Sequence, residues 1–69
     1  MKNKFAQRIK ELRKENKLNQ QKFAELCQVK QSCISKWERG ETIPDIEMLI
    51  SIAETFGVST DYLLGIKDF

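Results

Sequence analysis

Residues 18–40 constrain this chain more than any other segment, because their pattern predicts two short helices joined by a tight turn. Asn19 is a plausible N-cap for a helix over about 20–27, and a second helix over about 31–39 follows the turn at 28–30. Both helices carry apolar side chains at helical spacing, so one face of each is expected to pack inward. The side chains expected on these inward faces are Phe23, Ala24, Cys27, Ile34 and Trp37.

Residues 3–16 predict an amphipathic helix ahead of this pair. Phe5, Ile9 and Leu12 fall at helical spacing and form its inner side, while basic residues occupy the outer side. Asn16-Lys17 is expected to end this helix.

Two further helices are predicted after the pair. Asp45 is expected to cap the fourth helix and Gly57 to close it, whereas Ser59 is expected to cap a short last helix that stops at Gly65. The apolar stripe of the fourth helix is expected to consist of Ile46, Leu49, Ile50, Ala53 and Phe56.

The length of 69 residues is near the lower limit for a chain that folds on one hydrophobic core. No strand-like alternation occurs in the sequence. We therefore expect an all-α fold of five helices, in which the second and third form a helix-turn-helix. The domain is expected to be single, over residues 1–69 with its core in 3–65, and to leave little room for an internal substrate cavity.

Composition excludes several classes of protein. No segment approaches the ~20 apolar residues of a membrane span, and charged residues interrupt the N-terminal segment that would otherwise resemble a signal peptide, so we expect a cytoplasmic location. Cys27 and Cys33 have no histidine or third cysteine with which to form a metal site. We expect a buried thiol at Cys27 and a free thiol at Cys33, with a redox switch at Cys33 as the alternative.

Charge is distributed unevenly along the chain. Residues 1–17 contain seven Lys and Arg against two Glu, and residues 18–40 contain four against two. Residues 41–69 contain one Lys against six Asp and Glu. A basic front and an acidic back would orient the domain near a polyanion, although ordinary solvated helix faces would give the same counts.

The exposed side of the helix over 31–39 carries the residues that indicate a function. Glutamine can form a bidentate pair with adenine, lysine can reach the acceptors of guanine, and serine can bind a base or a phosphate. In a helix-turn-helix the second helix enters the major groove of DNA while the first lies across the phosphate backbone. The candidate base-reading residues are Lys30, Gln31, Ser32, Ser35 and Lys36.

The sequence resembles the lambda-repressor-like family of Cro and phage repressors, often called the XRE family, over nearly its whole length. The resemblance implies a five-helix DNA-binding domain, usually dimeric, that regulates transcription. The matching residues are Leu18-Asn19-Gln20, Phe23-Ala24, Val29, Ile34-Ser35-Lys36-Trp37-Glu38-Arg39-Gly40, Pro44, Gly57-Val58-Ser59 and Asp61-Tyr62-Leu63-Leu64-Gly65.

The resemblance also implies roles for individual residues. Gln20 matches a position that binds a phosphate and helps to orient a recognition side chain. Arg13 and Glu38 match a partly buried ion pair that ties the first helix to the third and is structural. The candidate phosphate-binding residues are Gln20, Asn19, Arg39 and Lys22.

Three residues depart from the family pattern. Cys27 replaces a larger aliphatic residue, which is expected to loosen the core slightly. Gln28 stands in the turn, where glycine is usual, so it is expected to need a left-handed backbone at modest cost. Leu26 falls on a face of the second helix that should be exposed. An exposed leucine is common on its own, and a contact with a partner is the alternative.

The expected function is sequence-specific binding of double-stranded DNA by a transcriptional regulator, most often a repressor. A homodimer, paired through the C-terminal helix region, would bind a two-fold operator. The alternative is a protein-interaction module of antitoxin-like or coactivator-like type, and we expect no enzyme activity, cofactor, metal or small-molecule ligand. The apolar residues that would serve either protein contact are Leu26, Tyr62, Leu64, Ile66 and Phe69.

Overall fold

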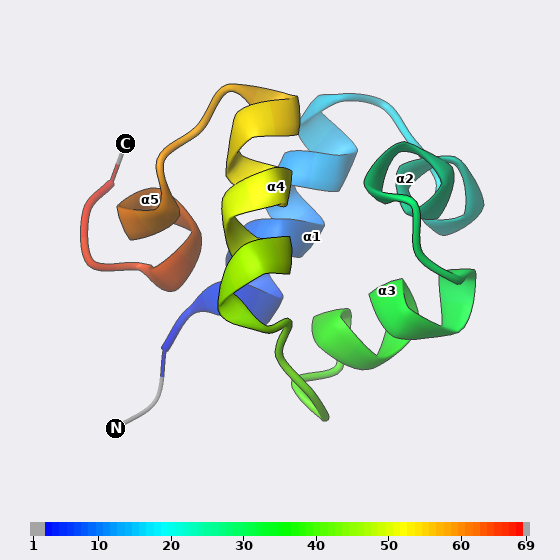
Figure 1. Ribbon diagram of the computed structural model, residues 1–69, viewed down its shortest axis with the longest axis horizontal. Coiled ribbons are helices and arrows are strands. Elements are labelled where there is room, and N and C mark those ends of the chain that lie inside the picture. Colours follow the sequence, from blue (N-terminus) through cyan, green and yellow to red (C-terminus); the bar gives the residue numbers. More distant parts are fainter. Residues whose placement is uncertain (1–2, 69) are drawn as a thin grey trace.

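The computed structural model describes residues 3–68, which form five α-helices and no strand. In Figure 1, α2 and α3 lie on one side of the domain and α5 on the other, with α1 and α4 between them. None of the helices within this range has the length and apolar character needed to cross a membrane. The helices are α1 (Phe5–Glu15), α2 (Gln20–Cys27), α3 (Gln31–Glu38), α4 (Ile46–Phe56) and α5 (Thr60–Leu64).

The three predicted N-caps are confirmed. The side chains of Asn19, Asp45 and Ser59 each accept a hydrogen bond from the backbone N–H three residues later, at 2.7, 2.8 and 2.9 Å. Each bond satisfies one of the N–H groups that a helix start leaves without a partner. Short polar residues therefore determine where α2, α4 and α5 begin.

Left-handed backbone ends several of the helices. Gln28 follows α2 at φ 61° and ψ 39°, which confirms the conformation predicted for the turn. Lys17, after α1, is also left-handed at φ 57°, although no glycine or asparagine at this position signals it in the sequence. Gly57, after α4, has φ 66°. A side chain with a Cβ pays for this conformation and glycine does not, so the turn after α2 is strained.

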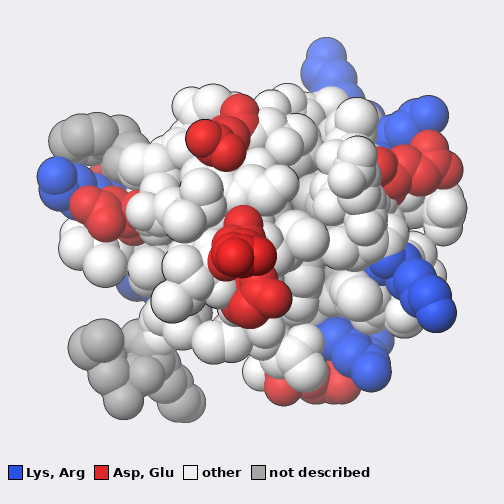
Figure 2. Space-filling view, viewed as in Figure 1, with Lys and Arg blue, Asp and Glu red and all other residues white. Residues whose placement is uncertain are grey.

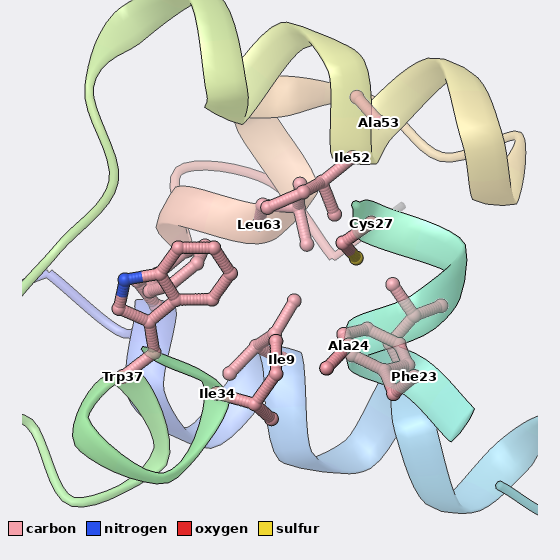
Figure 3. Close-up of a cluster of buried hydrophobic side chains, with 11 residues drawn as sticks. Ile9, Phe23, Ala24, Cys27, Ile34, Trp37, Ile52, Ala53 and Leu63 are labelled. Carbon is pink, nitrogen blue, oxygen red and sulfur yellow. The ribbon is translucent and has the colours of Figure 1, made fainter. Parts of the chain in front are cut away.

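One hydrophobic core receives side chains from all five helices (Figure 3). The Phe5 ring meets Trp37 edge-on with 5.9 Å between ring centroids, and this contact joins α1 to α3. Phe23 stacks on Phe56 at 4.7 Å and joins α2 to α4. The buried residues are Phe5, Ile9, Leu12, Phe23, Ala24, Cys27, Ile34, Trp37, Ile52, Ala53 and Leu63.

The predicted apolar stripe of α4 was partly wrong. Ala53 is buried and Leu49 and Phe56 pack against the core, as expected. Ile46 and Ile50, however, are 75% and 45% exposed, and the row that contains Ile52 and Met48 packs inward instead. Leu49, Ala53 and Phe56 form the central row of the helix. The row with Ile46 and Ile50 lies on one side of it and the row with Met48 and Ile52 on the other, and both are apolar. The sequence of α4 therefore does not decide which of these two rows is buried, and the positions of α2 and α5, which pack against α4, decide it.

Replacing Gln28 with glycine should stabilise the protein. The substitution relieves the left-handed backbone, and the exposed glutamine side chain contributes no core packing. The free energy of unfolding should rise by up to about 1 kcal/mol, and the melting temperature should rise by about 4–8 °C for each kcal/mol. Thermal unfolding followed by circular dichroism measures the change.

Gly57→Ala is the matched control, because a Cβ at this position meets nothing within 4 Å. Its effect is therefore conformational alone, and it should lower the melting temperature by a similar amount. A fall in melting temperature for Gln28→Gly as well would show that left-handed strain is not the dominant cost in the turn.

Candidate nucleic-acid interface

The exposed side of α3 is polar over its whole length. Gln31, Ser32 and Lys36 are exposed and Ser35 is half-buried, while Lys30 is exposed at the N-cap of the helix. Gln31 and Ser35 are four residues apart, as are Ser32 and Lys36, so the side chains form two adjacent rows. The structure therefore brings four of the candidate base-reading residues, Gln31, Ser32, Ser35 and Lys36, to the side of α3 opposite its buried residues, whereas Lys30 lies at the N-cap, in line with Ile34 and Trp37.

Acidic and basic side chains are unevenly distributed over the described residues. Figure 2 shows Asp and Glu side chains over α4 in the middle of the view, and several Lys and Arg side chains along the side of α2 and α3, where further acidic side chains stand beside them. The pairs Lys22–Glu25 and Arg39–Glu41 are examples of this mixture. An acidic α4 repels the phosphate backbone of a nucleic acid, so the charges disfavour approach with α4 in front.

A partly buried ion pair holds α3 against α1. Arg13 donates two hydrogen bonds to Glu38, from Nε to Oε2 at 2.7 Å and from Nη2 to Oε1 at 3.0 Å. The side chains are only 13% and 5% exposed, respectively. A third donor, Nη1, bonds the carbonyl of Leu18 at 2.9 Å, in the segment between α1 and α2. One guanidinium therefore joins three parts of the chain.

The electrostatic environment keeps Glu38 charged. Burial alone would raise the pKa of this carboxyl, but the hydrogen bonds from Arg13 and Gln20 and the charge of Arg13 outweigh burial and lower the pKa. Because the pKa of the folded state lies below that of the unfolded chain, the pair stabilises the fold at neutral pH. That contribution is lost as the pH falls through the lowered pKa.

Two glutamines extend this ion pair to the surface of α3. Gln20, the first residue of α2, donates from Nε2 to Glu38 Oε1 at 3.1 Å. Gln31, the first residue of α3, donates from Nε2 to Gln20 Oε1 at 2.6 Å. A candidate phosphate ligand and a candidate base reader are therefore bonded to one another. The signal available in the sequence was that each glutamine begins one helix of the pair.

The start of α2 presents groups suited to a phosphate. Asn19 uses its side-chain oxygen for the cap, so the nitrogen of the same amide is the atom able to donate to a phosphate. A helix N-terminus adds backbone N–H groups and a partial positive charge. Lys22 lies one turn into α2, exposed, with Nζ 3.5 Å from Glu25. Asn19, Gln20 and Lys22 therefore lie within the first turn of α2 or at its cap.

At the other end of α3, Arg39 is already engaged. Its Nη1 donates to Ser35 Oγ, and its Nε donates to Glu41 in an exposed ion pair. Arg39, a candidate phosphate ligand, and Ser35, a candidate base reader, are therefore bonded to one another. Glu41 offsets part of the charge of Arg39, but the guanidinium is exposed and has further N–H groups that could donate to a phosphate.

The two cysteines have different environments. Cys27 is buried, and burial raises the pKa of its thiol to about 11, so it is an unreactive core residue at neutral pH. Cys33 is a free, half-buried thiol on α3. Across residues 3–68, no group of three His, Cys, Asp or Glu side chains is arranged to hold a metal ion.

A family model described as helix-turn-helix (HTH_3) matches residues 9–63, which is most of the chain. The chain belongs to this helix-turn-helix family. The match confirms the resemblance to the Cro and phage-repressor group, and the five helices confirm the predicted fold class. The matched residues begin in α1 and end in α5, so the family unit includes all five helices.

Curated relatives are longer than this chain. The uncharacterized transcriptional regulator YobD of Bacillus subtilis is 33% identical over 64 residues, which are 93% of this chain and 57% of that protein. The activator BcrR of Enterococcus faecalis is 38% identical over 61 residues, which are 88% of this chain and 30% of that protein. The chain therefore spans about half or less of the length of these two relatives.

One of the similar solved structures was determined with bound operator DNA. The c2 repressor of Salmonella phage P22, determined in complex with a synthetic operator, superposes on this chain with a TM-score of 0.81 at 37% identity. The superposition covers 87% of this chain and 91% of the other. A transcriptional regulator from Listeria innocua superposes with a TM-score of 0.86 at 38% identity, over 94% of this chain and 61% of the other.

Removal of Arg13 should strongly destabilise the protein. Arg13→Met leaves the buried Glu38 carboxylate without its cation, which should lower the free energy of unfolding by about 3–5 kcal/mol. The double variant Arg13→Met, Glu38→Leu removes both charges and should recover most of the loss. Urea denaturation at neutral pH measures both changes.

Acid provides the control. As the pH falls, Glu38 becomes protonated in the variant and in the parent, so the difference in stability between Arg13→Met and the parent should narrow. A double variant as unstable as Arg13→Met would contradict an unpaired charge as the cause and would point to lost packing instead.

Proposed function

We propose that this chain binds double-stranded DNA sequence-specifically and acts as a transcriptional regulator, most often as a repressor. α3 enters the major groove, and its base-reading residues are Lys30, Gln31, Ser32, Ser35 and Lys36. The observation that carries the proposal is the chain of hydrogen bonds from the Arg13–Glu38 pair to Gln31, because it fixes an exposed polar side chain at the start of α3. The likeness to a repressor determined on its operator supports it.

Phosphate contacts orient α3 in the groove. The first turn of α2 supplies Gln20, Asn19 and Lys22 together with backbone N–H groups, and Arg39 supplies a further contact through N–H groups that are not bonded to Ser35 or Glu41. These contacts carry no sequence information, but they make binding fall steeply with salt. The proposal includes no catalytic step. It also implies that the protein is located with the DNA that it binds, in the cytoplasm.

We also propose a homodimer on a two-fold operator, with half-sites about one helical turn, ~34 Å, apart. An apolar groove of about 230 Å³ supports this part of the proposal. Two of its exposed residues, Ile43 and Ile46, are 65% and 75% exposed. Ile43 follows α3 closely in the chain, so pairing here would set the distance between the two α3 helices. The residues that line the groove are Asn3, Phe5, Ile43, Pro44, Ile46, Leu49 and Leu64.

The other apolar residues expected in a protein contact differ in their surroundings. Ile66 is 67% exposed, and Leu26 is 48% exposed on α2. Tyr62 is half-buried, with the Arg8 guanidinium 4.7 Å from the centre of its ring. Phe69 lies outside the described residues. The groove at the start of α4 therefore offers more exposed apolar surface than α5 itself.

Gln31→Ala should weaken binding to a selected operator about fivefold or more and leave binding to random DNA unchanged, because it removes a base contact. Lys22→Ala should weaken both equally and reduce the salt dependence by about one counterion, because it removes a phosphate contact. Selection from a random DNA pool followed by titrations at several salt concentrations measures both effects.

If Gln31→Ala weakened binding to the operator and to random DNA equally, Gln31 would not be a base-reading residue. Absence of salt-dependent DNA binding would favour a protein-interaction module.

Ile46→Glu should dissociate the dimer, since it puts a charge in the apolar groove of each copy. Sedimentation equilibrium of the free protein measures the change in dimer dissociation constant, which should rise at least about tenfold. Leu26→Glu is the control, because it puts the same charge on an exposed leucine of α2. If Leu26→Glu dissociated the dimer and Ile46→Glu did not, the dimer interface would lie on α2 and not at the apolar groove.

A further inference from the structure

Two of the described residues other than glycine have a left-handed backbone, Lys17 at φ 57° and Gln28 at φ 61°. An L side chain in this conformation is less stable than glycine would be, and strain of this kind is found most often where a side chain has a function. Gln28 lies in the turn of the helix-turn-helix. Lys17 lies between α1 and α2, and its exposed side chain contributes no core packing that would offset the strain.

Hydrogen bonds hold Lys17 in place beside the start of α2. Its backbone N–H donates to the Lys14 carbonyl at 2.9 Å, and the Leu18 N–H donates to the Arg13 carbonyl at 3.1 Å. The Arg13 guanidinium donates in turn to the Leu18 carbonyl at 2.9 Å. Asn19, the N-cap of α2, is two residues further along, so its Cα lies within about 7 Å of the Lys17 Cα. A lysine has a flexible four-carbon stem, so its ammonium can reach a phosphate bound at this helix start.

The charge needed at the start of α2 is not supplied by α2 itself. Lys22 Nζ lies 3.5 Å from Glu25, so part of its charge is already neutralised. Within residues 3–68, the ammonium of Lys17 has no acidic partner. The amide of Asn19 and the backbone N–H groups carry no net charge, whereas each phosphate of DNA carries one negative charge. Lys17 is therefore the cation beside this helix start whose charge is available to a phosphate.

We infer that Lys17 binds a phosphate of the DNA backbone beside the start of α2, and that its left-handed backbone is the cost in stability of a cation at this position. The contact is an ion pair between the ammonium and a phosphate oxygen, which releases a counterion from the DNA and does not depend on base sequence. Glycine at position 17 would relieve the strain and remove the cation. The inference rests on the proposed function and adds a phosphate ligand to it.

Lys17→Gly tests the inference, because stability and affinity should change in opposite directions. The melting temperature should rise by up to about 8 °C as the left-handed strain is relieved. The affinity for operator and for random DNA should fall about fivefold at ~0.15 M salt, and the slope of log affinity against log salt concentration should become less steep by about 0.9. Thermal unfolding and DNA titrations at several salt concentrations measure these quantities.

Three further variants are the controls. Lys17→Gln keeps a side chain on the left-handed backbone and loses the charge, so it should lose affinity without a rise in melting temperature. Lys17→Arg keeps the charge and should bind DNA as the parent does. Lys67→Ala removes a lysine charge after α5, on the side of the domain away from α2 (Figure 1), and should leave the salt slope unchanged.

The outcomes separate the inference from the proposed function. If Lys17→Gln bound DNA with the affinity and salt slope of the parent, the inference would be overturned, because the charge would have no part in binding. A loss confined to the operator would also overturn it, since a phosphate contact affects operator and random DNA alike. An equal change of slope in Lys67→Ala would attribute the effect to the net charge of the domain and overturn it as well. Absence of salt-dependent DNA binding by the parent protein would instead refute the proposed function.

Discussion

The Arg13–Glu38 ion pair is the interaction on which the arrangement of this domain depends. It links residues 25 positions apart in the sequence, and the remaining nitrogen of the guanidinium, Nη1, donates to the Leu18 carbonyl in the segment before α2. Charges removed from water are tolerated only when their hydrogen bonds are satisfied. The relative positions of the Arg13 and Glu38 side chains are therefore restricted to those that keep these hydrogen bonds. α3 is therefore held in angle and in rotation about its own axis, which apolar packing alone defines less sharply.

The apolar core provides the stability that the individual helices lack. The helices have 5 to 11 residues each, and helices of this length are marginal in water by themselves. Their ends are defined by polar caps and left-handed residues, while their faces are held by one core to which all five contribute. The consequence for function is that α3 can have a polar outer side, because Ile34 and Trp37 pack in the core behind it and the Arg13–Glu38 pair holds it against α1.

A chain of hydrogen bonds connects the interior of the protein to its proposed DNA surface. Glu38 accepts hydrogen bonds from Arg13 and from Gln20, and Gln20 accepts one from Gln31. The side chain of Gln31, at the start of α3, is therefore held by residues that are bonded to the ion pair joining α1 to α3.

The sequence by itself determined the features that depend on neighbouring residues. Asn19, Asp45 and Ser59 predicted helix starts because a cap bonds an N–H only three residues away. The left-handed Gln28 was expected because the family that the sequence resembles usually has glycine at this position of the turn. Most of the core followed from helical spacing. The polar residues on the outer side of α3 could be named in the same way, because they alternate with Ile34 and Trp37 along one helix.

Tertiary structure decided what depends on distant neighbours. α4 has apolar rows on both flanks of its central row, and the positions of α2 and α5 selected the Ile52 row for burial and left Ile46 exposed. The bond between Gln20 and Gln31, and the direction of the hydrogen bonds that start at Glu38, likewise arise only when α1, α2 and α3 converge. Spacing along a chain specifies which face a side chain occupies, but hydrogen-bond partners between helices are determined by packing in three dimensions.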